Sequence, residues 1–279
     1  MKKNKQNISL LKVENIKLKF GSRMILSDVN FSVEPGTITV ITGKSGCGKT
    51  TLLGIISGLL KPNDGKVYFK GKNILRWGDI RRSFYRSKSI GFIFQFFNLL
   101  NDYSAFENIL LPTMFNPFAR NASKKAKELI EYLNLKAISS NHPETLSGGE
   151  RQRIAIARAV INNPDIILAD EPTGNLDDES AEDINNLFIK LAKENNKAFV
   201  IVTHDHRIVE NSDFHYHLSD TALVLQAKTK NRSKKPAAKK SSSIAKIKPA
   251  GKTSQNKSDS SSRKNTKKTA KKTSAKKTK

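Results

Sequence analysis

Gly43-Lys44-Ser45-Gly46-Cys47-Gly48-Lys49-Thr50 stands between two apolar segments of different character. The β-branched run at 37–42 predicts a buried strand before it, and the apolar residues at 51–56 predict a helix that begins near Lys49. Glycines let the loop curl so that successive backbone N–H groups point at phosphate oxygens. The positive helix end and the Lys49 ammonium strengthen this attraction, and the Thr50 hydroxyl is a suitable oxygen ligand for Mg²⁺. We therefore predict a nucleoside triphosphate site at this phosphate loop, formed by Gly43, Lys44, Ser45, Gly46, Cys47, Gly48, Lys49, Thr50 and Thr51.

The positive charge of the chain is concentrated at its C-terminal end. The 279 residues have a net charge of +25, and residues 228–279 contribute 18 Lys and 2 Arg against one acidic residue, Asp259. This low-complexity segment has no aromatic residue and cannot bury enough apolar surface to offset chain entropy, so we expect it to be disordered. Residues 8–227 then form the folded part, which is long enough for one α/β domain with a smaller inserted subdomain.

The Lys-rich segment 228–279 is compatible with three roles. A run of like charges is by default a solvated extension. Its charge also permits weak, salt-dependent contact with nucleic acid, or attachment to anionic lipid at about 1 kcal/mol per basic residue. The lack of aromatic residues argues against a platform on which bases stack.

Cysteine content and hydropathy indicate the environment of the chain. Cys47 is the one cysteine, so a disulfide within the monomer is impossible, which fits a reducing cytosol. The apolar stretch at 8–11 is too short for the core of a signal peptide. No uncharged apolar run approaches the ~18 residues that a membrane helix needs. If the protein works at a membrane, we therefore expect another chain to span it.

Strand and helix patterns alternate along the folded part. Strands are predicted at 11–20, 29–33, 37–42, 66–69, 89–94, 166–169 and 198–202, and helices at 76–88, 150–161 and 180–195. From 98 to about 163 the apolar period is helical, with turns predicted at Pro112, Pro117 and Pro143. Alternating strands and helices predict a mostly parallel sheet covered on both faces, and the long helical stretch predicts an inserted subdomain.

Two carboxylates follow the apolar strand predicted at 166–169. Asp170 and Glu171 stand just past its end, at the edge where open α/β sheets bind ligands. Asp170 offers the hard oxygen that Mg²⁺ prefers, and Glu171 is placed to act as a base toward an attacking water. A solvated acidic turn is the alternative, and the phosphate loop argues against it.

Leu146-Ser147-Gly148-Gly149-Glu150-Arg151-Gln152-Arg153 resembles the signature motif of ATP-binding cassette (ABC) transporter ATPases. The other motifs of that family follow in order along residues 8 to about 226. Phe20 is similar to the aromatic residue that stacks on adenine, Gln95 to the glutamine of the Q-loop, and His204 to the switch histidine. Asn175-Leu176-Asp177 resembles the D-loop. Taken singly, Phe20 could be a core residue, Gln95 a polar strand end and His204 a partner of Asp205.

The resemblance implies an α/β fold with a P-loop NTPase core, an N-terminal antiparallel β part and a helical subdomain at about 98–163. It also implies a head-to-tail homodimer with two ATP molecules at the interface. Ser147, Gly148 and Gly149 form an anion-binding helix start, and with Asp177 they would contact the nucleotide of the facing subunit. The implied catalytic residues are Glu171, His204 and Gln95, and the implied Mg²⁺ ligands are Thr50, Gln95 and Asp170.

One branch of the family fits best. The segments 90–100, 107–112 and 170–177 are similar to ATPases of lipoprotein-releasing systems. This implies a peripheral ATPase on the cytoplasmic face of the inner membrane, which powers separate integral permease subunits docked near residues 95–108. A cell-division or macrolide-efflux ATPase is the alternative, acting as mechanotransmitter or scaffold. Asn101, the segment 218–221 and the Lys-rich segment depart from the branch pattern.

Two other classes of ATPase share these motifs. Chromosome-maintenance ATPases insert long coiled coils between the phosphate loop and the signature segment, whereas here about a hundred residues without sustained heptads intervene. Translation-associated factors have two cassettes in one chain, and this sequence has one.

Overall fold

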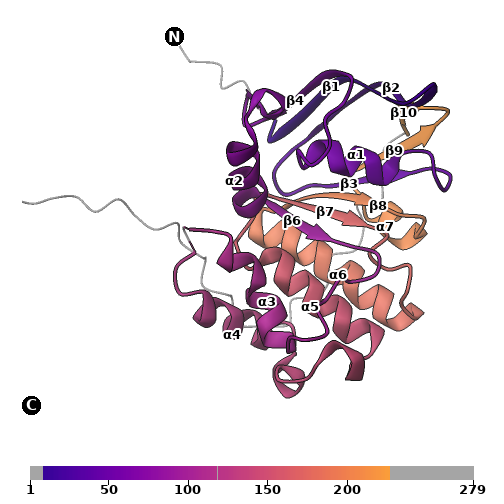
Figure 1. Ribbon diagram of the computed structural model, residues 1–279. Coiled ribbons are helices and arrows are strands. Elements are labelled where there is room, and N and C mark those ends of the chain that lie inside the picture. The colour runs from indigo at the N-terminus through magenta and orange to yellow at the C-terminus, as the bar shows by residue number, and fades with distance from the viewer. Residues whose placement is uncertain (1–8, 118, 227–279) are drawn as a thin grey trace, which may run out of the picture. The chain divides into compact units, whose positions relative to one another are not determined.

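The computed structural model describes residues 9–117 and 119–226, so the predicted disordered segment 228–279 lies outside the described residues (Figure 1). Within them, the larger sheet has the strand order β10-β9-β3-β8-β7-β6. Its strands are β3 (Ile38–Thr42), β6 (Ile90–Ile93), β7 (Ile166–Asp170), β8 (Ala198–Val202), β9 (Phe214–Ser219) and β10 (Ala222–Leu225). All of these pairings are parallel except that of β10 with β9. The mostly parallel sheet is therefore confirmed.

The N-terminal strands form a second, antiparallel sheet with the order β2-β1-β4-β5. Its strands are β1 (Leu11–Phe20), β2 (Arg23–Val33), β4 (Asp64–Phe69) and β5 (Lys72–Asn73). Buried and exposed residues alternate along most of β1, as expected for a sheet with one face on the core. Strand β2 begins well before the predicted start at Val29, because the turn at Gly21-Ser22 lets Arg23 pair directly with Phe20.

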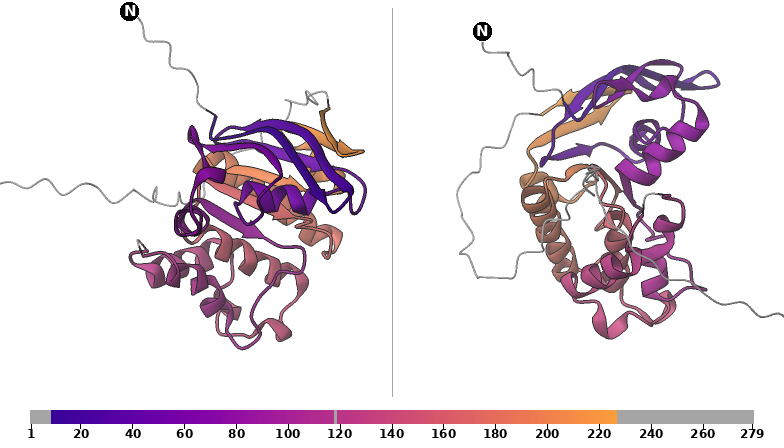
Figure 2. Two further views of the ribbon diagram at one scale, coloured as in Figure 1. Left: turned by 45° about the horizontal axis from the view of Figure 1, so that its top comes forward. Right: turned by 90° about the vertical axis from the view of Figure 1, so that its left-hand side faces the viewer.

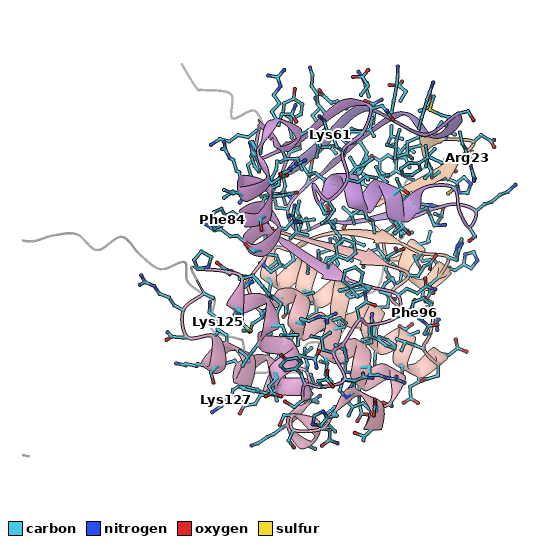
Figure 3. The ribbon with its side chains drawn as sticks, viewed as in Figure 1. Arg23, Lys61, Phe84, Phe96, Lys125 and Lys127 are labelled. Atoms are coloured by element: carbon cyan, nitrogen blue, oxygen red, sulfur yellow. The ribbon has the colours of Figure 1, made fainter. Side chains whose placement is uncertain are left out.

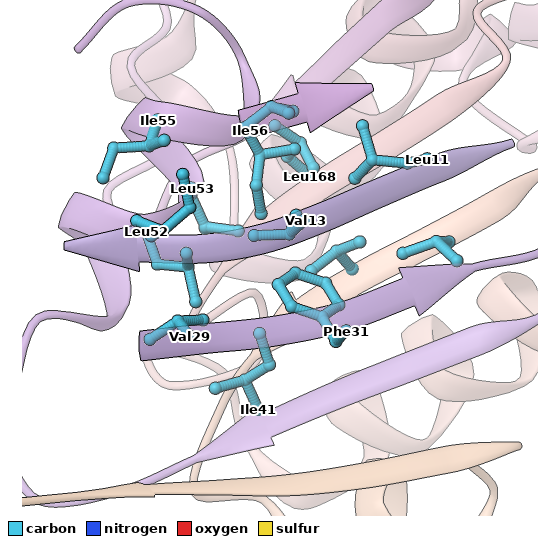
Figure 4. Close-up of a cluster of buried hydrophobic side chains, with 14 of the residues drawn as sticks. Leu11, Val13, Val29, Phe31, Ile41, Leu52, Leu53, Ile55, Ile56 and Leu168 are labelled. Atoms are coloured by element: carbon cyan, nitrogen blue, oxygen red, sulfur yellow. The ribbon is translucent and has the colours of Figure 1, made fainter. Parts of the chain in front are cut away.

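Apolar layers cover both faces of the parallel sheet, because successive residues of a strand point to opposite sides. On one face, Ile41 and Leu168 pack with the antiparallel sheet and with Leu52 and Leu53 (Figure 4). On the other, Val40 packs in a cluster with two long helices, α5 and α6 (Figures 1 and 2). The helices of these layers are α1 (Lys49–Ile56), α2 (Asp79–Ser89), α5 (Gly148–Val160), α6 (Asp178–Asn195) and α7 (His206–Glu210), and a short 3₁₀ turn occupies Ile74–Arg76.

Helices fill the chain between β6 and β7, which confirms the inserted helical part of the fold. They are α3 (Ala105–Met114), α4 (Ala122–Tyr132), two 3₁₀ turns (Lys136–Ile138 and Pro143–Thr145) and α5. Ile109 of α3, Ile130 of α4 and Ile154 of α5 belong to an apolar cluster of their own. Helix α5 contributes residues to this cluster and to the cluster around Val40, so it packs against both the helical part and the parallel sheet.

One residue predicted to form a turn lies within a helix. Pro112 was expected in a turn and instead lies inside α3, close enough to its end that only the bond to the Asn108 carbonyl is lost. Helix α1 ends at Ile56, because Gly58, two residues further on, adopts a φ of +70°. No helix in the described ranges is long and apolar enough to cross a membrane.

A hairpin without glycine joins β9 to β10. Its turn residues, Asp220 and Thr221, have φ values of 45° and 75°, which this kind of tight turn requires. The backbone N–H of Ser27 donates to the Thr221 carbonyl at 2.8 Å and so fixes the turn against β2. This contact with β2 therefore stabilises the hairpin of β9 and β10, although its turn lacks the Asp-Gly pair that is common in such hairpins.

Candidate functional site

A pocket of about 850 Å³ opens beyond the carboxyl ends of β3, β7 and β8. This is the edge at which open α/β sheets bind ligands. Most of the predicted site residues line it, namely Phe20, Ser45, Gly46, Gly48, Lys49, Thr50, Thr51, Gln95, Asp170, Glu171 and His204. Arg23 also lines it, and Figure 3 shows Arg23 on the same side of the view as Phe96, the neighbour of Gln95.

Lys49 is the buried cation of this pocket. Its side chain is almost fully enclosed, and its ammonium donates to the carbonyl oxygens of Gly43 at 2.7 Å and Lys44 at 3.0 Å. An ammonium has three N–H donors, so these bonds fix its position and leave one donor for a ligand. The phosphate loop thus holds a full positive charge at the N-terminus of α1, where an anion is already favoured.

Glycine is required at both ends of the phosphate loop. A Cβ on Gly43 would lie 2.3 Å from the Leu218 carbonyl oxygen of β9. Gly48 has a φ of +107°, and a Cβ there would lie 2.8 Å from the Ile25 side chain of β2. The loop backbone is therefore packed against both sheets, which holds its N–H groups in place.

Three predicted loop residues do not line the pocket. Gly43 and Lys44 act instead through their carbonyls, which accept from Lys49. Cys47 is a free, half-buried thiol that packs against the apolar cluster that contains Ile41 and Leu168. The Cys47 side chain therefore contributes to the packing of the loop.

Glu171 and His204 form a pair across the ends of β7 and β8. The Glu171 N–H donates to the Val202 carbonyl at 2.8 Å, and the residue turns into the left-handed region with a φ of 45°. This turn brings Glu171 Oε1 to 3.2 Å from His204 Nε2, while Oε2 accepts from the His204 backbone N–H at 3.2 Å. The carboxylate is 16% exposed. It is thus fixed at the pocket wall, unlike a carboxylate of a solvated turn.

Asp205 is a pocket residue that the sequence pattern did not single out. It caps α7, accepts from the Thr173 hydroxyl at 2.9 Å and forms a two-point contact with the Arg207 guanidinium. Partial burial is the largest single influence and favours the neutral carboxyl, but the hydrogen bonds from Arg207 and Thr173 together keep the pKa of Asp205 below its ordinary value. Its position directly after His204 was the one signal available.

Gln95 and Phe20 reach the pocket from strands of two different sheets. Gln95 follows β6, and its carbonyl accepts from Asn175 Nδ2 at 2.8 Å. Phe20 ends β1 and is 54% exposed, so it is not a core residue. An exposed ring on the pocket rim is a suitable surface on which a flat aromatic ligand can stack.

The signature segment lies outside this pocket. Ser147 caps α5 and exchanges hydrogen bonds with Glu150 in a capping box. A Cβ on Gly149 would lie 2.8 Å from Ser180 Oγ, and Ser180 donates to the Asp177 carboxylate from both its N–H and its hydroxyl at 2.8 Å. The structure therefore brings Ser147, Gly148, Gly149 and Asp177 together, but apart from the pocket of their own chain.

The described residues hold no cluster of three or more His, Cys, Asp or Glu side chains that could bind a metal. Thr50, Gln95 and Asp170 nevertheless all line the pocket and offer a hydroxyl, an amide and one carboxylate oxygen. These few hard oxygen ligands fit Mg²⁺, because substrate phosphates and water usually complete the coordination of this ion.

A family model described as ABC transporter matches residues 26–174, and the matched span includes the phosphate loop, Gln95, the signature segment and Glu171. The chain belongs to the ABC transporter family. The cassette is 42% identical over 216 residues to the lipoprotein-releasing system ATP-binding protein LolD of Cytophaga hutchinsonii, covering 77% of this chain and 99% of the relative. It is 41% identical over 223 residues to the protein of the same name from Treponema pallidum, covering 78% and 99%.

Solved structures agree with this assignment of the cassette. One is the dimeric structure of a post-hydrolysis state of the ATP-binding cassette MJ0796 bound to ADP and Pi. It is 36% identical with a TM-score of 0.73, covering 79% of this chain and 99% of that chain. A nucleotide-free ATP-binding cassette from an ABC transporter is 27% identical with a TM-score of 0.69, covering 79% and 91%. The cassette is an ATPase of the ABC type, as the sequence predicted.

Proposed function

We propose that this cassette hydrolyses ATP to power separate integral membrane permease subunits that release lipoproteins from the inner membrane. The observation that supports the activity best is the meeting of Lys49, Asp170 and the Glu171–His204 pair in one pocket. The cargo is proposed from the relatives named LolD, which the chain matches over nearly their whole length. Residues 8–227 are the proposed ATP-binding domain.

The proposed chemistry is in-line attack of water on the γ-phosphate of ATP, which breaks the bond to the β,γ-bridging oxygen and releases ADP and inorganic phosphate. Backbone N–H groups of the phosphate loop and the remaining Lys49 donor hold the phosphates. Glu171 accepts a hydrogen bond from the attacking water and polarises it, and His204 orients the Glu171 carboxylate and contacts the γ-phosphate. Phe20 stacks on the adenine ring, and Gln95 positions the water.

Thr50, Asp170 and Gln95 are the residues that would hold Mg²⁺ beside the phosphates. When bound, Mg²⁺ neutralises the charge that develops on the phosphate oxygens. This role follows from the oxygen donors in the pocket and from the proposed substrate. Thr50 can hold Mg²⁺ because it stands in the first turn of α1, next to Lys49.

The catalytic unit is proposed to be a head-to-tail homodimer. Ser147, Gly148 and Gly149 form a helix start that can receive an anion, yet they do not line the pocket of their own chain. A second copy facing the pocket would place this helix start and Asp177 on the nucleotide. The dimeric cassette structures that the chain resembles support this arrangement.

The permease is proposed to dock next to Gln95, at the cytoplasmic face of the membrane. Phe96, Leu100 and Tyr103 are exposed apolar side chains there, with exposed fractions of 71%, 47% and 41%. Asn101 stands beside them and bonds Glu144 and His142, so the departure from the branch pattern still gives an anchored loop. Contact of segment 228–279 with anionic lipid or nucleic acid stays a prediction, since that segment lies outside the described residues.

Reconstitution tests this function. The full chain is co-purified with its integral permease subunits and placed in proteoliposomes that contain a labelled lipoprotein. ATP-dependent transfer of the lipoprotein to a soluble acceptor is expected for the wild type and not for Lys49→Ala. ATP hydrolysis without any lipoprotein transfer would contradict the cargo and would favour the cell-division or macrolide-efflux alternative.

A further inference from the structure

The backbone directly after Gln95 is held in an unfavourable conformation. Phe97 and Asn98 have φ values of 61° and 49°, so two consecutive residues with side chains lie in the left-handed region. Such residues persist only where surrounding contacts hold them, and they concentrate at functional sites. The contacts that hold them therefore decide where the chain around Gln95 can lie.

Arg158 of α5 supplies these contacts. One terminal guanidinium nitrogen donates to the Phe97 carbonyl and the other to the Asn98 carbonyl. The planar fork of an arginine suits two neighbouring acceptors, which a lysine cannot match. Arg158 is half-buried, and this burial lowers the pKa of its guanidinium to about 10.

Two further contacts hold the same loop. The Arg151 guanidinium lies 5.4 Å from the centre of the Phe97 ring, and Arg151 and Arg158 stand two turns apart on α5. From the other side, Asn175 Nδ2 donates to the Gln95 carbonyl at 2.8 Å. The loop is thus bound to α5 and to the segment before Asp177, which are the two elements proposed above to contact the nucleotide of a second subunit.

Helix α5 connects its N-terminal cap to this loop as one rigid element. Ser147 caps the helix and Arg158 lies near its other end, a separation of about 16 Å at 1.5 Å per residue. A displacement of α5 that begins at Ser147 is therefore passed to the Phe97 and Asn98 carbonyls. Gln95 lines the pocket two residues earlier, so its side chain follows the same displacement.

We propose that Arg158 is a positioning residue, which fixes the backbone of Phe97 and Asn98 and thereby sets the place of the Gln95 side chain in the ATP pocket. The inference rests on the proposed function, because it requires that Gln95 acts on bound ATP. It makes turnover depend on α5, so that engagement of the signature segment and the competence of Gln95 are linked within one chain.

A double-mutant cycle on the full chain tests this role. The variants are Arg158→Gln, Gln95→Ala and the two combined, with Lys193→Gln as control, since Lys193 lies on α6 and pairs with Asp213 at the surface, away from the pocket. We expect Arg158→Gln to lower kcat by about 10- to 100-fold, the scale of a misplaced catalytic group, with little change in the KM for ATP. Lys193→Gln is expected to leave both values unchanged.

The interaction between the two sites is decisive. In the Gln95→Ala background, Arg158→Gln should cost little further activity, because both changes remove the same function. Arg158→Lys, which keeps the charge without the fork, enters the same cycle and replaces Arg158→Gln if that variant does not fold. The inference would be overturned if the combined variant lost kcat by the product of the two single losses. A wild-type kcat in the Arg158 variants would overturn it as well.

The outcome separates this inference from the proposed function. If the wild-type chain shows no ATP turnover, or turnover that survives Lys49→Ala, the proposed function fails. If turnover requires Lys49 and the Arg158 and Gln95 losses are independent, only the positioning role fails.

Discussion

Replacing Glu171 by Gln removes a negative charge from a nearly enclosed position without changing the length of the side chain. The carboxylate is 16% exposed and contacts His204 through Nε2 and the backbone N–H, both at 3.2 Å. A Gln amide can still accept from the backbone N–H, so the loss of stability should stay near 1 kcal/mol, the net value of one hydrogen bond. Loss of a positioned base should lower turnover by about 10²- to 10⁴-fold, or about 2.7 to 5.4 kcal/mol in the barrier.

The assay compares the full-length Glu171→Gln variant with the wild type and with Glu128→Gln, an exposed carboxylate on α4. Phosphate release gives turnover, equilibrium binding gives the affinity for ATP, and size-exclusion chromatography with ATP reports dimer formation. Glu171→Gln should bind ATP, form the dimer and hydrolyse very slowly, while Glu128→Gln behaves as wild type. Turnover of Glu171→Gln within about threefold of the wild type would refute the proposed role of the carboxylate.

Three further predictions concern other parts of the chain. His204→Ala should lower kcat by about 10- to 100-fold, the value of one hydrogen bond to a charged group, and an unchanged kcat at saturating ATP would exclude its contact with the γ-phosphate. Because the pKa of Asp205 is depressed, its charge stabilises the fold above its ordinary pKa, and this contribution is lost as the pH falls below about 4. The difference in unfolding free energy between wild type and Asp205→Asn should therefore shrink between pH 7 and pH 3.5, and a constant difference would contradict the assignment. Truncation after Ala227 should weaken binding to anionic liposomes or to nucleic acid in low salt, and equal binding in both assays would leave only a solvated extension.

Local sequence patterns were sufficient for the elements that position the phosphates. Strands β1 and β8 have the predicted bounds, because alternation in one and a β-branched run in the other decide their structure within a few residues. The phosphate loop and Asp170 follow from the same reasoning, since each stands at the end of a buried strand. The edge of the sheet then brings them together without further information.

Contacts between distant residues could not be read from the sequence. The bonds of Arg158 to the loop after Gln95 and of Asp205 to Thr173 join segments that no local period relates. Pro112 marks a turn in most contexts, but near the C-terminal end of α3 it removes only one backbone hydrogen bond of the helix. The same holds for the hairpin at Thr221, whose unfavourable φ is maintained by a bond to the neighbouring sheet.

The most direct test of the account is ATP turnover of the full chain beside that of Lys49→Ala. The ammonium of Lys49 is the one buried charge that the phosphate loop directs toward a ligand's phosphates, and its removal should lower turnover by about 100-fold or more. The account predicts that the wild type retains and hydrolyses ATP and that Lys49→Ala loses hydrolysis while remaining folded. A wild-type chain that does not retain ATP, or equal turnover in the two proteins, would contradict it.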